Sequence, residues 1–217
     1  IGGAVLAFHE GPEHGWTEPL TVAGAAAAVL GAAGFVLWEL RHPQPLLDVR
    51  LFRNRALASG SLNLLIVFAV MFALFLVLVQ FLQAVLGYSA LRAAASLLPM
   101  AALLMPLSST APRIAQRTGT RPLLLGGTTT VAAGLVWMAA VPTIEGGYLS
   151  VLPGLIVIGA GMGLVMTPST VAITESLPVE KQGVASALND TVREVGGAIG
   201  VALLGSVLSS GYGASIA

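Results

Sequence analysis

Hydrophobic positions gather in long stretches that are separated by short polar connections. Each stretch is close to or longer than the roughly 20 residues that an α-helix needs to cross a bilayer core. The pattern therefore predicts an all-α protein, a polytopic membrane helix bundle, and residues 1–8 predict the last two turns of a further spanning helix. The six complete stretches are approximately Leu20–Leu40, Leu57–Leu86, Ala93–Ser109, Leu123–Val141, Val151–Ile173 and Ala187–Leu208.

Basic residues lie almost entirely on one side of these stretches. Connections 41–55, 113–121 and 174–186 hold arginines and a lysine, whereas the opposite connections hold only Arg92 and several acids. Positive residues mark the cytoplasmic side of a membrane protein. We therefore expect 41–55 inside, Glu145 and the C-terminus outside, and a multi-pass protein of the cell inner membrane or plasma membrane.

Composition excludes several classes of function. Charged residues make up 9% of the chain and mean hydropathy is +0.89, whereas a soluble domain carries about 25% charged residues. Cysteine is absent and the three histidines lie in connections, so we expect no metal site, no cofactor and no catalytic residues. A cluster of His9 and His14 with Glu10 and Glu13 is better interpreted as an exposed turn. No continuous basic face predicts nucleic-acid binding.

Three regions follow from the pattern. Residues 1–40 hold the end of one transmembrane helix and one complete extra helix. Residues 41–56 form a cytoplasmic linker with an amphipathic segment suited to the membrane surface. Residues 57–217 form a bundle of five transmembrane helices. The chain begins without methionine and ends without a polar tail, so we expect a piece of a longer membrane protein.

Small residues and prolines predict where helices pack closely. Gly196 and Gly200 form a GxxxG pair, and Gly159 and Gly163 share the same spacing five residues before Pro168. Glycines at this spacing let helix backbones approach each other in lipid. Proline kinks a helix and frees a backbone carbonyl.

Several stretches resemble the major facilitator superfamily, and within it the fourteen-helix drug:proton antiporters. The loop 111–122 is similar to the family's cytoplasmic signature through Arg117, Gly119 and Arg121, although Ala111 replaces its first glycine and Gln116 its acid. The runs GAGMGLVMTPST (159–170) and LPVEKQGVASALNDTVREVGGAIGVALLG (177–205) also resemble that family. The resemblance covers essentially the whole chain.

This resemblance implies the fold of a second half-bundle without its last helix, and export of amphipathic, drug-like compounds in exchange for protons by alternating access. It also implies a partner N-terminal half-bundle that carries the main proton-coupling acids, because no acid appears deep in a complete span here. Two alternatives stay open: a transporter of another small molecule, such as an amino acid, lipid precursor or siderophore, and a membrane structural subunit that does not transport.

Candidate cavity residues combine flexible, aromatic and polar side chains on the predicted spans. Methionine adapts to ligands of varied shape, although it also packs against neighbouring helices or lipid. An amide in a membrane span is expected to face protein or water. The candidates are Met71, Phe75, Gln80, Gln83, Met100, Met105, Met162, Met166 and Thr167.

Charged residues at the inner ends of spans are candidate gating residues. Arg117 and Arg121 are suited to hold acids or helix ends of a facing bundle, and the alternative is that they only fix the topology. Asp190 and Arg193 are three residues apart and are expected to pair within their helix, next to Glu194, in the first turns of the last span.

Overall fold

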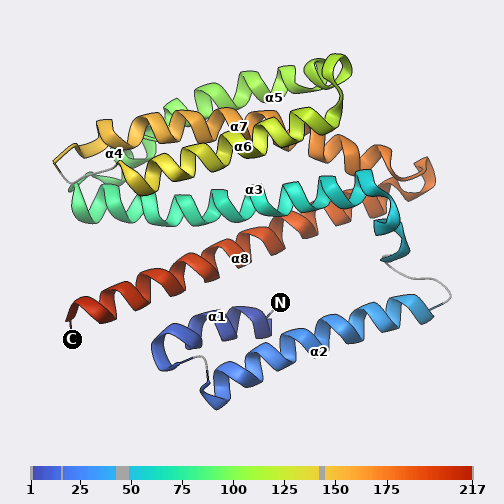
Figure 1. The fold of residues 1–217 in the computed structure, drawn as a ribbon, viewed down its shortest axis with the longest axis horizontal. Helices are drawn as coiled ribbons and strands as arrows, with labels where there is room; N and C mark the ends of the chain where they lie inside the picture. The colour runs from blue at the N-terminus through green and yellow to red at the C-terminus, as the bar shows by residue number, and fades with distance from the viewer. Residues whose placement is uncertain (1, 16, 43–48, 142–144, 217) are drawn as a thin grey trace.

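The structure is a computed structural model that describes residues 2–15, 17–42, 49–141 and 145–216, with side chains undescribed at 8, 9, 12–14 and from 208 onward. The described part of the chain is entirely helical, as the hydrophobic pattern predicts. Figure 1 shows long helices running nearly parallel or antiparallel to one another. The elements in order are α1 (Gly2–His14), α2 (Pro19–Arg41), η1 (Val49–Arg53), α3 (Arg55–Gln80), η2 (Phe81–Val85), α4 (Ala90–Ala95), α5 (Leu98–Thr118), α6 (Thr120–Ala140), α7 (Gly147–Glu175), η3 (Val179–Lys181) and α8 (Gln182–Ile216).

Five segments of the described chain are long and apolar enough to cross a membrane. They are Pro19–Arg41, Arg55–Val85, Ala90–Thr118, Thr120–Ala140 and Gly147–Glu175. They match the first five predicted stretches, and α8 runs through the sixth.

Helix α7 is the centre of the bundle. It packs against α5, α6 and α3, and α3 in turn packs against α8. One core cluster surrounds the middle of α7 and includes the fully buried Leu155, Ile158 and Met162. A second cluster joins the start of α3, the end of α7 and the first half of α8 through Leu57, Ile173 and neighbours.

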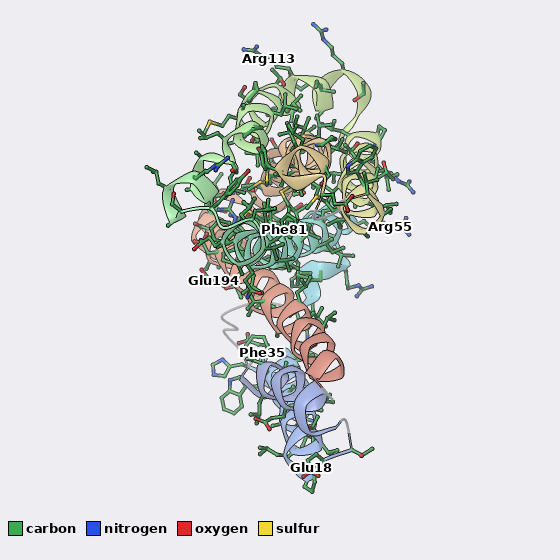
Figure 2. All side chains as sticks on the ribbon, turned by 90° about the vertical axis from the view of Figure 1, so that its left-hand side faces the viewer. Glu18, Phe35, Arg55, Phe81, Arg113 and Glu194 are labelled. Carbon is green, nitrogen blue, oxygen red and sulfur yellow. The ribbon has the colours of Figure 1, made fainter. Side chains whose placement is uncertain are left out.

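Helices α1 and α2 form a smaller unit that reaches the bundle through α8. Figure 2 looks along the helices and shows this pair, with the labelled Glu18 and Phe35, projecting below α8. Close contact between α1 and α2 depends on Gly3 and Gly24, because a Cβ atom on Gly3 would lie 2.6 Å from the carbonyl oxygen of Gly24.

The third predicted span is interrupted. Residues 90–95 form a short helix that Ser89 caps by accepting a hydrogen bond from the Arg92 amide at 3.3 Å. The chain turns at Ser96 and Leu97, and α5 then begins with Pro99 in its first turn. Proline suits a helix start because its missing N–H would have no helical partner there.

Three predicted boundaries are wrong. The first helix continues to His14 instead of ending at residue 8, and α8 begins at Gln182 rather than near 187. The segment 111–118, predicted as loop, is helical, and Ala111 in it is fully buried. In the linker, residues 49–53 form a 3-10 helix, and the rest of the predicted amphipathic segment, 43–48, lies outside the described residues.

A single residue therefore separates α5 from α6. Gly119 adopts φ 92° and ψ 150°, and its amide donates to the carbonyl oxygen of Ala115 at 2.8 Å. This positive φ is a conformation that residues with a Cβ atom avoid. Gly119 thus reverses the chain without a loop.

Candidate substrate cavities

An apolar groove lies between α3 and α5. These helices both pack on α7 but hardly touch each other. On each helix the lining residues recur at three- and four-residue spacing, which places them on one face. The groove encloses about 210 Å³, and all nine lining residues are apolar: Met71, Leu74, Phe75, Leu78, Leu97, Met100, Ala101, Leu104 and Met105.

Two glycines of α7 set the position of α5 beside this groove. A Cβ atom on Gly159 would lie 2.5 Å from the Met100 carbonyl oxygen, and one on Gly163 would lie 2.7 Å from that of Leu104. The α5 backbone therefore rests directly on α7. This contact fixes the rotation of α5 and leaves the side chain of Met105 69% exposed at the groove.

The structure brings four of the nine cavity candidates together in this groove, and a fifth, Thr167, lines a neighbouring cavity with Met105. Met71, Phe75, Met100 and Met105 all line the α3–α5 groove. The leucines that share the groove were missed, although Leu74 and Leu78 on α3, and Leu97 and Leu104 before and on α5, lie at helical spacing from the candidates.

The remaining candidates lie elsewhere. Gln80 and Gln83 are exposed beyond the groove, where the chain changes to a π-helical turn over Phe81–Val85. Met162 is fully buried in the core, so in this conformation it packs between helices and does not line an open cavity. Met166 is partly buried between the two core clusters, and Thr167 shares a hydrogen bond with Ser108 of α5.

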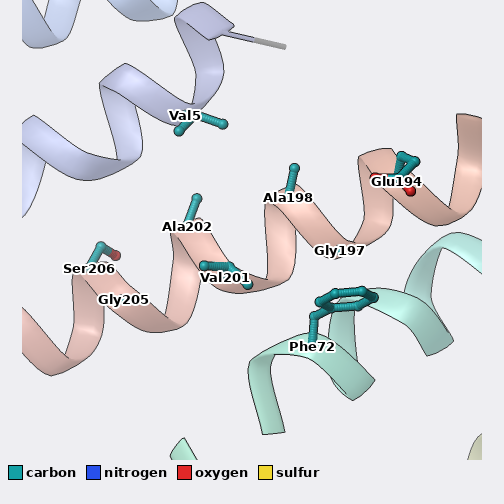
Figure 3. Close-up of a pocket in the computed structure, with 9 residues that line it drawn as sticks. All are labelled: Val5, Phe72, Glu194, Gly197, Ala198, Val201, Ala202, Gly205 and Ser206. Carbon is teal, nitrogen blue, oxygen red and sulfur yellow. The ribbon is translucent and has the colours of Figure 1, made fainter. Parts of the chain in front are cut away.

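A second, larger cavity lies between α1, α3 and α8. It encloses about 510 Å³, and most of its α8 wall consists of glycine, alanine and serine. Figure 3 shows Val5 of α1 on one side of α8 and Phe72 of α3 on the other, with Glu194 at one end. Among the residues whose side chains the structure describes, Glu194 is the only charged one in this lining.

Glu194 lies deeper than the sequence predicted. Because α8 begins at Gln182, Glu194 is about three turns into the helix. It lines the same cavity as Phe72, which is close to the middle of the 31-residue span Arg55–Val85. Glu194 thus lies further into its helix than the first turns in which the sequence placed it.

The predicted pairing of Asp190 with Arg193 is also wrong. The Arg193 guanidinium instead points toward α7 and α3, with Nη2 3.5 Å from the Thr170 hydroxyl and Cζ 5.1 Å from the centre of the Phe68 ring. Thr170 in turn donates to the Asn189 side chain at 3.3 Å. Arg193 thus contacts neighbouring helices instead of the nearby Asp190 carboxylate, which stays exposed.

Gly196 and Gly200 lie against the backbone of α3. A Cβ atom built on Gly196 would lie 2.4 Å from the Leu65 carbonyl oxygen. One built on Gly200 would lie 2.0 Å from the Ala69 carbonyl oxygen. Pro168 is buried within α7. The α8 glycines therefore keep α8 close to α3 and place the Glu194 side of α8 next to Phe72.

Arg117 and Arg121 flank the turn at Gly119. Arg117 lies in the last turn of α5 and Arg121 in the first turn of α6, and both side chains are exposed. Neither makes an ion pair within the described ranges. Both guanidinium groups are therefore available to groups outside this bundle.

Known proteins resemble this chain over nearly its full length. Residues 1–201 match the Major Facilitator Superfamily. The chain is 32% identical over 216 residues to the multidrug resistance protein Stp of Mycobacterium tuberculosis, covering 100% of this chain and 40% of that protein. It is 33% identical over 216 residues to the puromycin resistance protein pur8 of Streptomyces alboniger, covering 98% of this chain and 43% of that one.

A third relative is the tetracenomycin C resistance and export protein of Streptomyces glaucescens. The chain is 32% identical to it over 203 residues, which cover 93% of this chain and 37% of that protein. The chain thus spans about 40% of the length of the multidrug resistance relative. With its apolar spanning helices and a match over nearly all of its length, this chain belongs to the Major Facilitator Superfamily, a family of membrane transporters and not of enzymes.

Proposed function

We propose that the complete transporter carrying this chain exports amphipathic, drug-like compounds in exchange for protons by alternating access. The observation that carries the proposal is the α3–α5 groove, where three methionines and a phenylalanine meet among apolar neighbours. Relatives named for multidrug resistance and antibiotic export support the same substrate class.

The chemistry of the groove suits a broad range of apolar surfaces. None of the described residues that line it has a hydrogen-bonding side chain, so it favours ligands by burying their apolar area rather than by polar recognition. Met71, Met100 and Met105 have flexible, polarizable thioethers that adapt to different shapes. The volume of 210 Å³ is below the roughly 300–1,000 Å³ of a complete drug site. We therefore assign the groove one part of a larger site that the rest of the transporter completes.

Alternating access needs contacts that open and close on the inner side. We assign this role to Arg117 and Arg121, whose guanidinium groups are exposed next to the turn at Gly119. A guanidinium holds a carboxylate or carbonyl oxygens at two points. Pairing with a facing half-bundle would stabilise one conformation of the transport cycle.

The test is transport into everted membrane vesicles from cells that produce the complete transporter. We expect uptake of a fluorescent amphipathic dye when the vesicle interior is made acidic, and loss of uptake when a protonophore collapses the gradient. Vesicles from cells without the transporter are the control. Uptake that requires ATP and ignores the protonophore would exclude the antiport mechanism. Absence of uptake with every amphipathic dye would favour another substrate or a structural subunit.

A further inference from the structure

We propose that the α3–α5 groove continues into a polar end, a cavity between α5 and α7 in which Ser108 and Thr167 bind an uncharged hydroxyl group of the ligand. This inference rests on the proposed export of drug-like compounds and narrows their chemistry to an apolar body that carries a neutral hydroxyl. The cavity encloses about 480 Å³, which lies within the roughly 300–1,000 Å³ of small-molecule sites. It is lined by Leu104, Met105, Ser108, Ser109, Pro112 and Thr167.

The groove and this polar cavity form one path along α5, because Leu104 and Met105 line both. The α5 residues that line the path form two rows at helical spacing, Met100, Leu104, Ser108 and Pro112 in one and Ala101, Met105 and Ser109 in the other. This spacing places them on one face of the helix. Along that face the side chains change from apolar to hydroxyl-bearing after Met105. A ligand that lies along α5 would therefore meet apolar surface at one end and hydrogen-bonding groups at the other.

The hydroxyls of Ser108 and Thr167 keep hydrogen-bonding capacity for a ligand. They share one hydrogen bond, in which either oxygen can be the donor. Two hydroxyls carry two hydrogens, so the pair retains one O–H donor and several acceptor lone pairs. Neither hydroxyl has another hydrogen-bond partner in the part of the chain that the structure describes. Both side chains are only partly buried, so a ligand in the cavity can reach them.

Pro112 adds a backbone acceptor to the same wall. Proline has no amide hydrogen, so the carbonyl group of Ser108, four residues earlier, lacks its α-helical donor. The hydroxyls of Ser109 and Thr110 donate to the carbonyl oxygen of Pro106 instead, at 2.8 and 2.9 Å. Within a membrane span, such a freed carbonyl needs a donor from protein, water or ligand. A ligand hydroxyl can donate to this carbonyl and accept the remaining O–H through the same oxygen atom.

The cavity favours a neutral polar group over an ion. None of the described residues that line it is charged. Moving an ion from water into a site without a counter-charge costs far more than moving a hydroxyl, whose smaller cost is offset by hydrogen bonds. The ligand group that fits both the donors and the acceptors of this wall is therefore an uncharged hydroxyl.

The experiment compares two neutral drugs that differ at one substituent, thiamphenicol with a hydroxyl group and florfenicol with fluorine in its place. Equilibrium dialysis measures the binding of each drug to the purified complete transporter, and the readout is the ratio of the two dissociation constants. The cavity variants are Ser108→Ala, Thr167→Val and Pro112→Ala, the last of which returns an amide hydrogen to the Ser108 carbonyl. A monodisperse size-exclusion profile verifies that each variant is folded.

The matched control is Thr174→Val. Thr174 lies on α7 like Thr167, but its hydroxyl donates to carbonyl oxygens of its own helix, and it lines neither the groove nor the polar cavity. The change in the ratio between wild type and a variant isolates the contact with the drug hydroxyl, because effects common to both drugs cancel.

We expect wild type to prefer thiamphenicol, and each cavity variant to reduce that preference by about three- to tenfold, the scale of one neutral hydrogen bond. Pro112→Ala should do so without removing a polar side chain. Thr174→Val should keep the wild-type ratio.

Four results would overturn the inference. Wild type without a preference for thiamphenicol would show that the hydroxyl is not recognised. An unchanged ratio in folded Ser108→Ala and Thr167→Val would place the hydroxyl elsewhere. Equal weakening of both drugs would show that the cavity shapes the groove but does not bind the hydroxyl. The same loss of preference in Thr174→Val would reveal an indirect effect through α7. If wild type binds both drugs but exports neither, the proposed function fails, and the binding ratio still tests this cavity.

Discussion

The contact between α8 and α3 gives a sharp test of helix packing through Gly200→Ala. In the structure a Cβ atom at this position would lie 2.0 Å from the Ala69 carbonyl oxygen, whereas ordinary van der Waals contact begins at 3.4 Å. The helices would therefore have to separate locally by roughly 1.4 Å, or the Ala69 carbonyl would have to move. Added atoms in a packed interface cost about 1–3 kcal/mol.

The same helix offers a matched control in Gly205→Ala. No atom lies within 4 Å of a Cβ atom built on Gly205. Alanine favours the helical backbone over glycine by about 1 kcal/mol, so this variant should be neutral or more stable. Because this gain applies to both changes on one helix, the two variants should differ by the packing cost alone, about 1–3 kcal/mol in free energy of unfolding.

The assay is unfolding of the purified complete transporter in detergent, followed by intrinsic tryptophan fluorescence. Gly200→Ala should lower the unfolding midpoint, and Gly205→Ala should leave it unchanged or raise it. Gly196→Ala should resemble Gly200→Ala, because its Cβ atom would meet the Leu65 carbonyl oxygen at 2.4 Å. Equal midpoints for Gly200→Ala and Gly205→Ala would refute close packing of α8 on α3.

Three further predictions use other parts of the chain. A cysteine at Gln116 should resist an impermeant thiol reagent added outside the cell while one at Glu145 reacts, since basic residues gather on the Gln116 side; external labelling at Gln116 would invert the topology. Arg117→Ala should slow exchange with little change in drug affinity. If a two-point contact forms the gate, Arg117→Lys should recover only part of the wild-type exchange rate. Full activity of the lysine variant would favour a purely topological role. Thr128→Val removes a 2.8 Å hydrogen bond from Thr128 to Asn63 between α6 and α3, which should lower the free energy of unfolding by about 0.6 kcal/mol and at most about 1.7 kcal/mol; an unchanged unfolding midpoint would count against this interhelical bond.

Hydrophobicity predicted the helices well, because a membrane span is defined by length and apolarity alone. Helix ends were predicted less well, because a helix continues beyond the membrane whenever its residues tolerate it. Residues 111–118 look polar and carry Pro112, yet they extend α5. For the same reason, α8 begins at Gln182, earlier than predicted. Glu194 therefore lies further into that helix than predicted.

Residue type alone could not separate cavity from core. Met100 and Met162 are both methionines on predicted spans, yet one lines the α3–α5 groove and the other is fully buried. The difference depends on helix rotation, which is set by backbone contacts such as Gly159 against Met100. A single sequence identifies the small residues but not which neighbour each one touches. For the same reason, the cavity of Phe72 and Glu194 had no signal local to either residue.

The turn at Gly119 has a consequence for mutational tolerance. At φ 92° and ψ 150° the backbone occupies a region that is essentially restricted to glycine, and other residues there cost about 1–3 kcal/mol. In a saturation library of the complete transporter, position 119 should retain glycine under selection. The exposed neighbours Thr118 and Thr120 should accept many residues. A position that tolerates only glycine, between two positions that tolerate many residues, would indicate that one residue reverses the chain.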